Sequence, residues 1–195
     1  MTILHIDSSI TGDVSVSRRL SAAALSKIMA AQPGAKVIYR DLVAAPLDHY
    51  VMTDKPGRDT EGSLFSATIL QEFLAADTIV IGAPLYNFTI SSQLKAWIDR
   101  IVISGVTYKF TEHGAVNLIG AKRVIVLVSR GAVYQPGTPW TPFEHAETYL
   151  KAVFGAIGIK PEVIVAEGTA YGPDSRAGAI AGAEAAIADI STLAT

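Results

Sequence analysis

The chain has 195 residues and a mass of 20.6 kDa, a length that predicts a single domain, 1–195, with a substantial core. Only 17% of the residues are charged and the formal net charge is −2, so the basic face typical of proteins that bind nucleic acids or anionic membranes is missing. There is no cysteine, which excludes disulfides, thiolate zinc sites, iron–sulfur clusters and cysteine nucleophiles.

The first residues, "MTILHIDSS", do not resemble a secretory signal, because Asp7 interrupts a short apolar run that no basic residue precedes. No segment approaches the roughly 20 apolar residues of a membrane-spanning helix. We therefore expect a cytoplasmic protein without a membrane partner.

Five short segments rich in Val, Ile and Leu predict strands at Ile3–Asp7, Lys36–Arg40, Thr78–Gly82, Arg123–Val128 and Pro161–Ala166. Their apolar runs are nearly continuous, which is typical of parallel strands covered by helices on both faces. Helical patterns alternate with them at Ser17–Ala31, Leu64–Ala75, Ile90–Val102, Thr141–Ile157 and Asp174–Ile190. This alternation predicts an α/β fold with a doubly wound, five-stranded parallel sheet, right-handed crossovers and helices on both faces.

The connection from Val43 to Ser63 is unusually long and carries no sustained periodicity. Loops of this length inside a domain are usually functional or disordered. Two interpretations stay open: a mobile surface excursion, or a lid or dimer contact.

The residues after the first strand indicate a possible anion site. In open parallel sheets, ligands bind beyond the carboxyl ends of the strands. The segment "DSSITGDVSVSRRL" has neither a dinucleotide-binding glycine motif nor a P-loop lysine, but it opens into a helix and contains the hydroxyls of Ser8, Ser9, Ser15 and Ser17. Hydroxyls beside the free N–H groups of a helix N-terminus suit a phosphate. The alternative is an ordinary helix cap with solvated serines.

Two further loops at the same edge are suited to a planar ligand. After the third strand, "PLYNF" offers flat side chains and the amide of Asn87. After the fourth, "SRGAVYQPG" offers Gly131, which permits close backbone approach, and Tyr134. The alternative is core aromatics beside a tight turn, but three such loops at one edge favour a binding site.

These motifs resemble those of the short flavodoxin-like, FMN-dependent NAD(P)H azoreductases and quinone reductases of bacteria. The resemblance rests on "SSITGDVSVS", "APLYNFTISSQLKAWIDR", "GVTYKFTEHG", "SRGAVY" and "AEGTAYGP", which span nearly the whole chain in the family's order. It implies the sheet order 2-1-3-4-5, FMN as cofactor, NADH or NADPH as reductant and quinones or azo compounds as acceptors. It also implies a homodimer with its active sites at the subunit interface.

The resemblance assigns residues to the site as well. It implies a phosphate turn at Ser9, Ser15, Val16 and Ser17. One side of the flavin ring would contact Pro84, Leu85, Tyr86, Asn87 and Phe88, and its other edge would contact Ser129, Arg130, Gly131 and Ala132. Substrate contacts would come from Phe88, Phe110 and Tyr134. Many relatives have glycine where this chain has Ala132, which adds a methyl group beside the ring.

The leading functional hypothesis is hydride transfer from NAD(P)H to quinones and azo compounds in ping-pong fashion. A flavin performs this chemistry itself, so no catalytic side chain and no metal are expected. The alternative is a flavodoxin-like electron carrier that docks on protein partners. The near-neutral charge argues against a carrier, and the missing G-x-S-x-G motif argues against a serine hydrolase.

Overall fold

A central parallel sheet organises the computed structural model, which describes residues 1–190 and leaves 191–195 of the expected domain outside. Its strands are β1 (Thr2–Asp7), β2 (Lys36–Asp41), β3 (Thr78–Pro84), β6 (Arg123–Ser129) and β7 (Glu162–Ala166). Their spatial order is β2-β1-β3-β6-β7, and all four pairings are parallel. Counted within this sheet the order is 2-1-3-4-5, so the fold prediction is confirmed.

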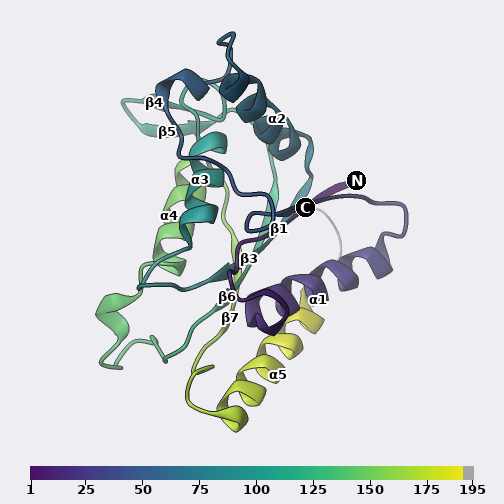
Figure 1. Cartoon of the computed structure of the whole chain (residues 1–195), viewed down its shortest axis with the longest axis vertical. Coiled ribbons are helices and arrows are strands. Elements are labelled where there is room, and N and C mark those ends of the chain that lie inside the picture. The colour runs from purple at the N-terminus through teal and green to yellow at the C-terminus, as the bar shows by residue number, and fades with distance from the viewer. Residues whose placement is uncertain (191–195) are drawn as a thin grey trace.

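Helices cover both faces of the sheet, as the sequence predicts (Figure 1). One face carries α1 (Val16–Ala31) and α5 (Pro173–Asp189), and the other carries α2 (Glu61–Ala75), α3 (Ser92–Ile101) and α4 (Glu147–Ala156). Each face has its own hydrophobic cluster. In β1, Ile3 belongs to the cluster under α1 and α5, while Leu4 and Ile6 belong to the opposite one. Successive strand residues point to opposite faces, so one strand supplies both cores.

A β-hairpin that the predicted pattern lacks follows α3. It pairs β4 (Tyr108–Thr111) with β5 (Gly114–Asn117) in antiparallel fashion, separate from the main sheet. Four-residue strands are too short to show a clear two-residue period in the sequence. In Figure 1 the hairpin lies at the upper left, whereas α1 and α5 lie at the lower right.

Helix α4 begins six residues later than predicted, so the expected helix Thr141–Ile157 is wrong at its start. Thr141–Phe143 form a short 3₁₀ turn instead. The carboxylate of Glu144 accepts hydrogen bonds from the backbone N–H groups of Ala146, Glu147 and Thr148 at 2.8–3.1 Å. A side chain that satisfies the first N–H groups of a helix defines its start, and this cap overrides the proline signal upstream.

The long connection between β2 and α2 is anchored in part. It contains a 3₁₀ turn, Met52–Asp54, and buries the side chains of Leu47 and Asp54. An oxygen of Asp54 lies 3.6 Å from a guanidinium nitrogen of Arg100 in α3, and Thr60 caps α2 by accepting from the N–H of Ser63. Its role as lid or dimer contact stays a hypothesis.

None of the helices within residues 1–190 is both long enough and apolar enough to cross a membrane.

Candidate functional site

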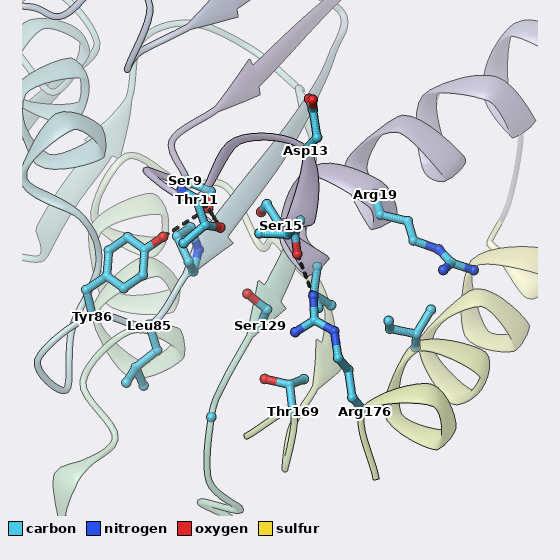
Figure 2. Close-up of a pocket in the computed structure, with 15 residues that line it drawn as sticks. Ser9, Thr11, Asp13, Ser15, Arg19, Leu85, Tyr86, Ser129, Thr169 and Arg176 are labelled. Atoms are coloured by element: carbon cyan, nitrogen blue, oxygen red, sulfur yellow. Dashed lines mark hydrogen bonds between the residues drawn. The ribbon is translucent and has the colours of Figure 1, made fainter. Parts of the chain in front are cut away.

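A cavity of about 710 Å³ lies at the carboxyl ends of β1, β3 and β6 (Figure 2). Eight of the residues expected to bind the cofactor line it: Ser9, Ser15, Val16, Pro84, Leu85, Tyr86, Ser129 and Gly131. The three loops singled out in the sequence therefore meet around one space, at the edge where parallel sheets bind ligands.

The β1–α1 connection forms a polar end to this cavity. Ser15 caps α1, because its Oγ accepts the N–H of Arg18 at 3.2 Å, and it also lies 3.2 Å from the Oγ of Ser17. The N–H groups of Val16 and Ser17 have no acceptor within the helix. Together with the positive end of the helix dipole, they make this turn a favourable place for an anion.

Tyr86 links this turn to the β3–α3 loop. Its hydroxyl lies 2.9 Å from the Oγ of Ser9 and accepts the backbone N–H of Ile10 at 3.2 Å. Ser9 in turn lies 3.0 Å from the hydroxyl of Thr11. The aromatic ring of Tyr86 is therefore held against the serine turn, and both belong to one wall of the cavity (Figure 2).

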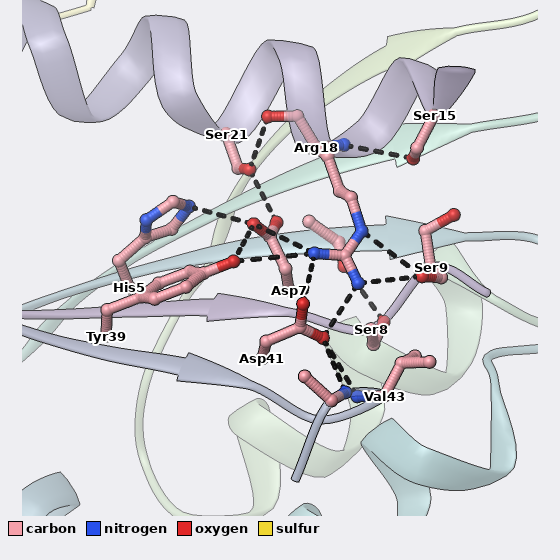
Figure 3. Close-up of polar contacts among 12 residues, drawn as sticks. His5, Asp7, Ser8, Ser9, Ser15, Arg18, Ser21, Tyr39, Asp41 and Val43 are labelled. Atoms are coloured by element: carbon pink, nitrogen blue, oxygen red, sulfur yellow. Dashed lines mark hydrogen bonds and ion pairs between the residues drawn. The ribbon is translucent and has the colours of Figure 1, made fainter. Parts of the chain in front are cut away.

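A polar cluster centred on Arg18 supports the turn from behind (Figure 3). The guanidinium of Arg18 donates to both carboxylate oxygens of Asp41, at 2.7 Å each, and to the backbone carbonyl of Ser9 at 2.9 and 3.2 Å. Asp7 lies 3.8 Å from the same guanidinium and accepts the hydroxyl of Tyr39 at 3.1 Å. We call Asp7, Arg18, Tyr39 and Asp41 the Arg18 cluster.

Asp41 and Arg18 are charged at neutral pH, whereas Tyr39 is neutral. The hydrogen bonds from Arg18 lower the pKa of Asp41 to about 2, and the same bonds raise the pKa of Arg18. Burial, followed by the negative charge of Asp7, raises the pKa of Tyr39 to about 12. Burial also lowers the pKa of neighbouring His5, whose Nε2 lies 3.7 Å from Asp7. His5 is therefore neutral at pH 7 and acts as part of the core.

The β3–α3 loop contains a strained turn. Tyr86 and Thr89 exchange backbone hydrogen bonds of 2.8 and 3.0 Å around Asn87 and Phe88, which have φ values of 47° and 72°. Positive φ at both central positions is typical of a type I′ turn, which Asn tolerates and Phe does not favour. Backbone strain of this kind is concentrated at functional sites.

Asn87 and Phe88 lie outside the lining of the main cavity. Asn87 lines a neighbouring cavity of about 540 Å³, which shares Tyr86 with the first. The ring of Phe88 packs on that of Phe143, with 5.1 Å between their centroids. Both residues are therefore next to the expected ring site, but neither lines the main cavity.

The β6 loop contributes Ser129 and Gly131 to the lining of the cavity. The carbonyl of Ser129 accepts the N–H of Leu85 at 2.8 Å, which joins the two loops. A Cβ at Gly131 would have one neighbour within 4 Å, the Cβ of Ala170 at 3.4 Å, which is about an ordinary van der Waals contact. The carbonyl of Ala132 accepts the N–H of Gly168 at 3.1 Å, and Ala132 does not line the cavity.

Arg130 points away from the cavity into a buried cluster with three carboxylates. It pairs with Glu147 and lies 3.5 Å from Glu144 and 3.5 Å from Glu167. Burial favours the neutral form of Glu144, but the N–H groups at the start of α4 and the charge of Arg130 hold its pKa below the ordinary value. We call Arg130, Glu144, Glu147 and Glu167 the Arg130 cluster.

The remaining predicted residues also lie outside the lining of the cavity. Ser17 is fully buried beneath the turn, while Tyr134 is only 7% exposed and lies under the guanidinium of Arg130. Phe110 is 71% exposed and sits on the β4–β5 hairpin. Substrate contacts from Phe110 and Tyr134 remain predictions.

Sequence reasoning did not single out seven residues of the lining: Thr11, Asp13, Val14, Arg19, Thr169, Arg176 and Ile180. Four of them lie within or beside the serine turn, and Thr169 lies in the quoted motif "AEGTAYGP", so local signals for these existed. Arg176 and Ile180 belong to α5, where nothing in the local sequence indicates a ligand.

The donors of the cavity fit a phosphorylated planar cofactor such as flavin mononucleotide. One end offers hydroxyls and free N–H groups, and the other offers Pro84, Leu85 and the backbone beside Gly131. The volume is in the range of cofactor and drug-sized pockets. Within residues 1–190 no group of three or more His, Asp or Glu side chains is arranged to hold a metal ion.

The fold and site define a flavodoxin-like α/β protein with a ligand cavity at its switch point. Residues 1–190 match the model of the family described as "Flavodoxin-like fold", and the chain belongs to that family.

Similar proteins agree with the motif resemblance, which is confirmed. The chain is 53% identical over 194 residues to the FMN-dependent NADH:quinone oxidoreductase of Methylorubrum extorquens (strain PA1), covering 94% of this chain and 95% of the relative. Azoreductase from Bacillus anthracis str. Sterne superposes with a TM-score of 0.85 at 30% identity, covering 96% and 97% of the two chains. An FMN-dependent NADH-azoreductase from Bacillus anthracis str. Ames Ancestor, solved in complex with FMN, has a TM-score of 0.82 at 26% identity, covering 96% and 98%.

Proposed function

We propose that this chain is an FMN-dependent oxidoreductase that transfers hydride from NAD(P)H to quinones and azo compounds. The observation that carries the proposal is one cavity with a turn suited to an anion at one end and with Pro84, Leu85 and Gly131 at the other. Relatives that match nearly the whole chain are named FMN-dependent NADH:quinone oxidoreductase, which supports both cofactor and activity.

The chain's own residues bind and orient the cofactor. Ser9, Ser15 and the N–H groups of Val16 and Ser17 are suited to the phosphate. Two groups of residues flank the space for the ring: Pro84, Leu85, Tyr86, Asn87 and Phe88 on one side, and Ser129, Arg130, Gly131 and Ala132 on the other. Asn87 reaches the ring edge only if it turns from its present cavity, and Arg130 and Ala132 contribute only backbone.

When bound, FMN supplies the hydride chemistry, so that one NAD(P)H and one proton reduce a quinone to a hydroquinone. The protein's task is to hold the ring and to exclude water from its exposed face. A single planar space for both substrates discriminates weakly among flat acceptors, which supports a broad acceptor range. NAD(P)H and acceptor then occupy the space in turn, and the kinetics are ping-pong.

A homodimer completes the site in this proposal. Phe110 lies on the exposed hairpin, beyond the end of α3, a helix of about 15 Å. It lines the substrate space only if a second chain brings it there. The exposed rings of Phe88, Trp140 and Phe143 form an aromatic patch beside the cavity, which supports a partner surface or acceptor contact. We further propose that residues 1–195 form one domain and that the protein works in the cytoplasm.

The alternative function is a flavodoxin-like electron carrier, which would pass electrons only to protein partners. The net charge of −2 does not favour docking on a strongly basic partner. The two functions differ in a simple observation, because a carrier needs a separate reductase whereas an NAD(P)H oxidoreductase reduces its own flavin.

The test uses the purified protein reconstituted with FMN. We expect a flavin absorption spectrum, bleaching by NADH or NADPH without a partner protein, and reoxidation by a quinone. Initial rates at varied NADH and quinone should give parallel double-reciprocal lines. If NAD(P)H does not reduce the bound flavin, the enzymatic function is contradicted. Intersecting double-reciprocal lines would show that NAD(P)H and the acceptor do not share one binding space. A monomer of 20.6 kDa with full activity would contradict the dimer.

A further inference from the structure

We propose that Arg176, in the first turn of α5, supplies the positive charge that holds the phosphate of FMN. The inference rests on the proposed function, because it concerns how the same cavity selects its cofactor. Arg176 lines this cavity together with Ser9 and Ser15, although some 160 residues separate it from the serine turn.

The position of the Arg176 side chain is defined by a contact with the turn itself. Its Nη2 donates a hydrogen bond to the backbone carbonyl of Val14, the residue before the Ser15 cap. Figure 2 shows the guanidinium below Ser15 and beside Ser129 and Thr169. A guanidinium has five N–H donors in a planar fork, so this single bond leaves most of its donors for a ligand.

Among the cationic side chains of residues 1–190 that line this end of the cavity, only Arg176 has no carboxylate beside it. Arg19 also lines the cavity, but its guanidinium pairs with Glu184 at 2.8 Å and its side chain is 59% exposed. Asp13 also lines the cavity, but Figure 2 shows its side chain directed away from Ser15 and Arg176. Within residues 1–190, no carboxylate lies within 4.0 Å of the guanidinium of Arg176.

An anion binding in this turn would gain most from Arg176. Hydroxyls and N–H groups hold a phosphate by hydrogen bonds alone. An arginine beside these donors adds a charge-assisted, forked contact, which is about twice as strong as a neutral hydrogen bond. This contact would be made with FMN but not with riboflavin, which lacks the phosphate. Arg176 is therefore assigned as a specificity-determining residue.

The experiment measures dissociation constants of the apoprotein for FMN and for riboflavin by quenching of flavin fluorescence. The variants are Arg176→Ala, Arg176→Lys and Arg19→Ala. Lys160→Ala is the control, because it removes an equal charge at an exposed position beside the amino end of β7. Thermal unfolding of each apoprotein shows whether the variants fold like the wild type.

We expect Arg176→Ala to raise the dissociation constant for FMN by about tenfold or more and to leave that for riboflavin unchanged. Arg176→Lys should recover part of the loss, Arg19→Ala should have a smaller effect, and Lys160→Ala none. The salt dependence of FMN binding should weaken in Arg176→Ala, because one charge no longer contributes.

Three results would overturn the inference. If Arg176→Ala binds FMN as tightly as the wild type, Arg176 does not contact the phosphate. An equal loss of FMN and riboflavin would show that Arg176 merely supports the turn through Val14. An effect of Arg19→Ala as large as that of Arg176→Ala would remove the special role of Arg176. A wild-type protein that bound neither flavin would instead refute the proposed function itself.

Discussion

Two arginine side chains, Arg18 and Arg130, lie behind the cavity and differ in the groups that they contact. Arg18, behind the serine turn, donates two hydrogen bonds to the backbone carbonyl of Ser9 and two to Asp41. Arg130, behind the β6 loop, directs its guanidinium to the carboxylates of Glu144, Glu147 and Glu167 and lies over the ring of Tyr134. One arginine side chain thus holds a cavity loop directly, and the other does not.

The loop at Arg130 is held by its backbone instead. The N–H of Arg130 donates to the carbonyl of Ala166, and its own carbonyl accepts from the N–H and hydroxyl of Thr169. The side chain joins the start of α4 to the segment after β7, which are packed around it. We therefore expect the Arg18 cluster to affect ligand binding and the Arg130 cluster mainly to stabilise the fold.

The largest expected effect is therefore on stability, at Arg130. Arg130→Met leaves three carboxylates without their guanidinium in a site where Arg130 is 4% exposed. Removal of one partner from a buried ionic cluster costs about 3–5 kcal/mol of the free energy of unfolding. Urea unfolding at pH 7 measures it.

The control for Arg130 is Arg19→Met, which breaks a single exposed pair with Glu184. Such pairs contribute about 0–1 kcal/mol. Equal losses in the two variants would contradict a structural role specific to the Arg130 cluster.

A smaller effect, with a defined pH dependence, is expected at Asp41. Its pKa falls from 3.8 to about 2 in the folded protein because of Arg18, so the carboxylate stabilises the fold above pH 3.8 and loses this contribution as the pH falls toward 2. Asp41→Asn should cost at most about 2 kcal/mol at pH 7 and much less near pH 2. Urea unfolding across this pH range checks it, with exposed Asp48→Asn as control. A loss that did not shrink toward pH 2 would contradict this origin.

A change in FMN affinity is expected when Arg18 is replaced. Arg18→Lys keeps the charge but cannot make the forked contacts to Asp41 and the Ser9 carbonyl. The turn should loosen, and FMN should bind about fivefold more weakly, a loss of about 1 kcal/mol.

The matched control for Arg18→Lys is Arg40→Lys. Arg40 lies on β2 and makes a similar forked pair with Glu72 of α2, and neither residue lines the cavity. Flavin titration of both apoproteins separates the two. Equal FMN affinities for Arg18→Lys and the wild type would show that the Arg18 cluster does not affect ligand binding.

The smallest effect on FMN binding is expected at Asn87, and it tests whether the amide of this residue contacts the flavin. Asn87→Ala removes the amide and also places alanine at a φ of 47°, where a side chain costs about 1–2 kcal/mol. Asn87→Gly removes the amide without that strain. If Asn87 contacts the ring edge, both variants bind FMN more weakly in fluorescence titrations. If glycine restores the affinity, only the turn conformation matters.

The sequence by itself determined the sheet and the location of the site. Nearly continuous apolar runs specify parallel strands covered on both faces, and the carboxyl ends of such strands converge at one edge. Three loops at this edge were identifiable in the sequence: the serine turn, "PLYNF" and the Gly131 loop. Glycine, proline and helix-capping residues affect the conformation of the backbone next to them, so the sequence itself carries these signals. These short-range signals also placed the five helices, apart from the starts of α2 and α4, which lie three residues earlier and six residues later than predicted.

Only the tertiary structure decided which side chains face the ligand space. The orientation of Asn87 follows from a turn whose φ values no local pattern specifies, and Arg130 turns away because three glutamates from distant segments surround it. Arg176 reaches the serine turn because α5 packs beside α1. Contacts across long sequence separations depend on the packing of whole elements, and no periodicity within one element encodes them.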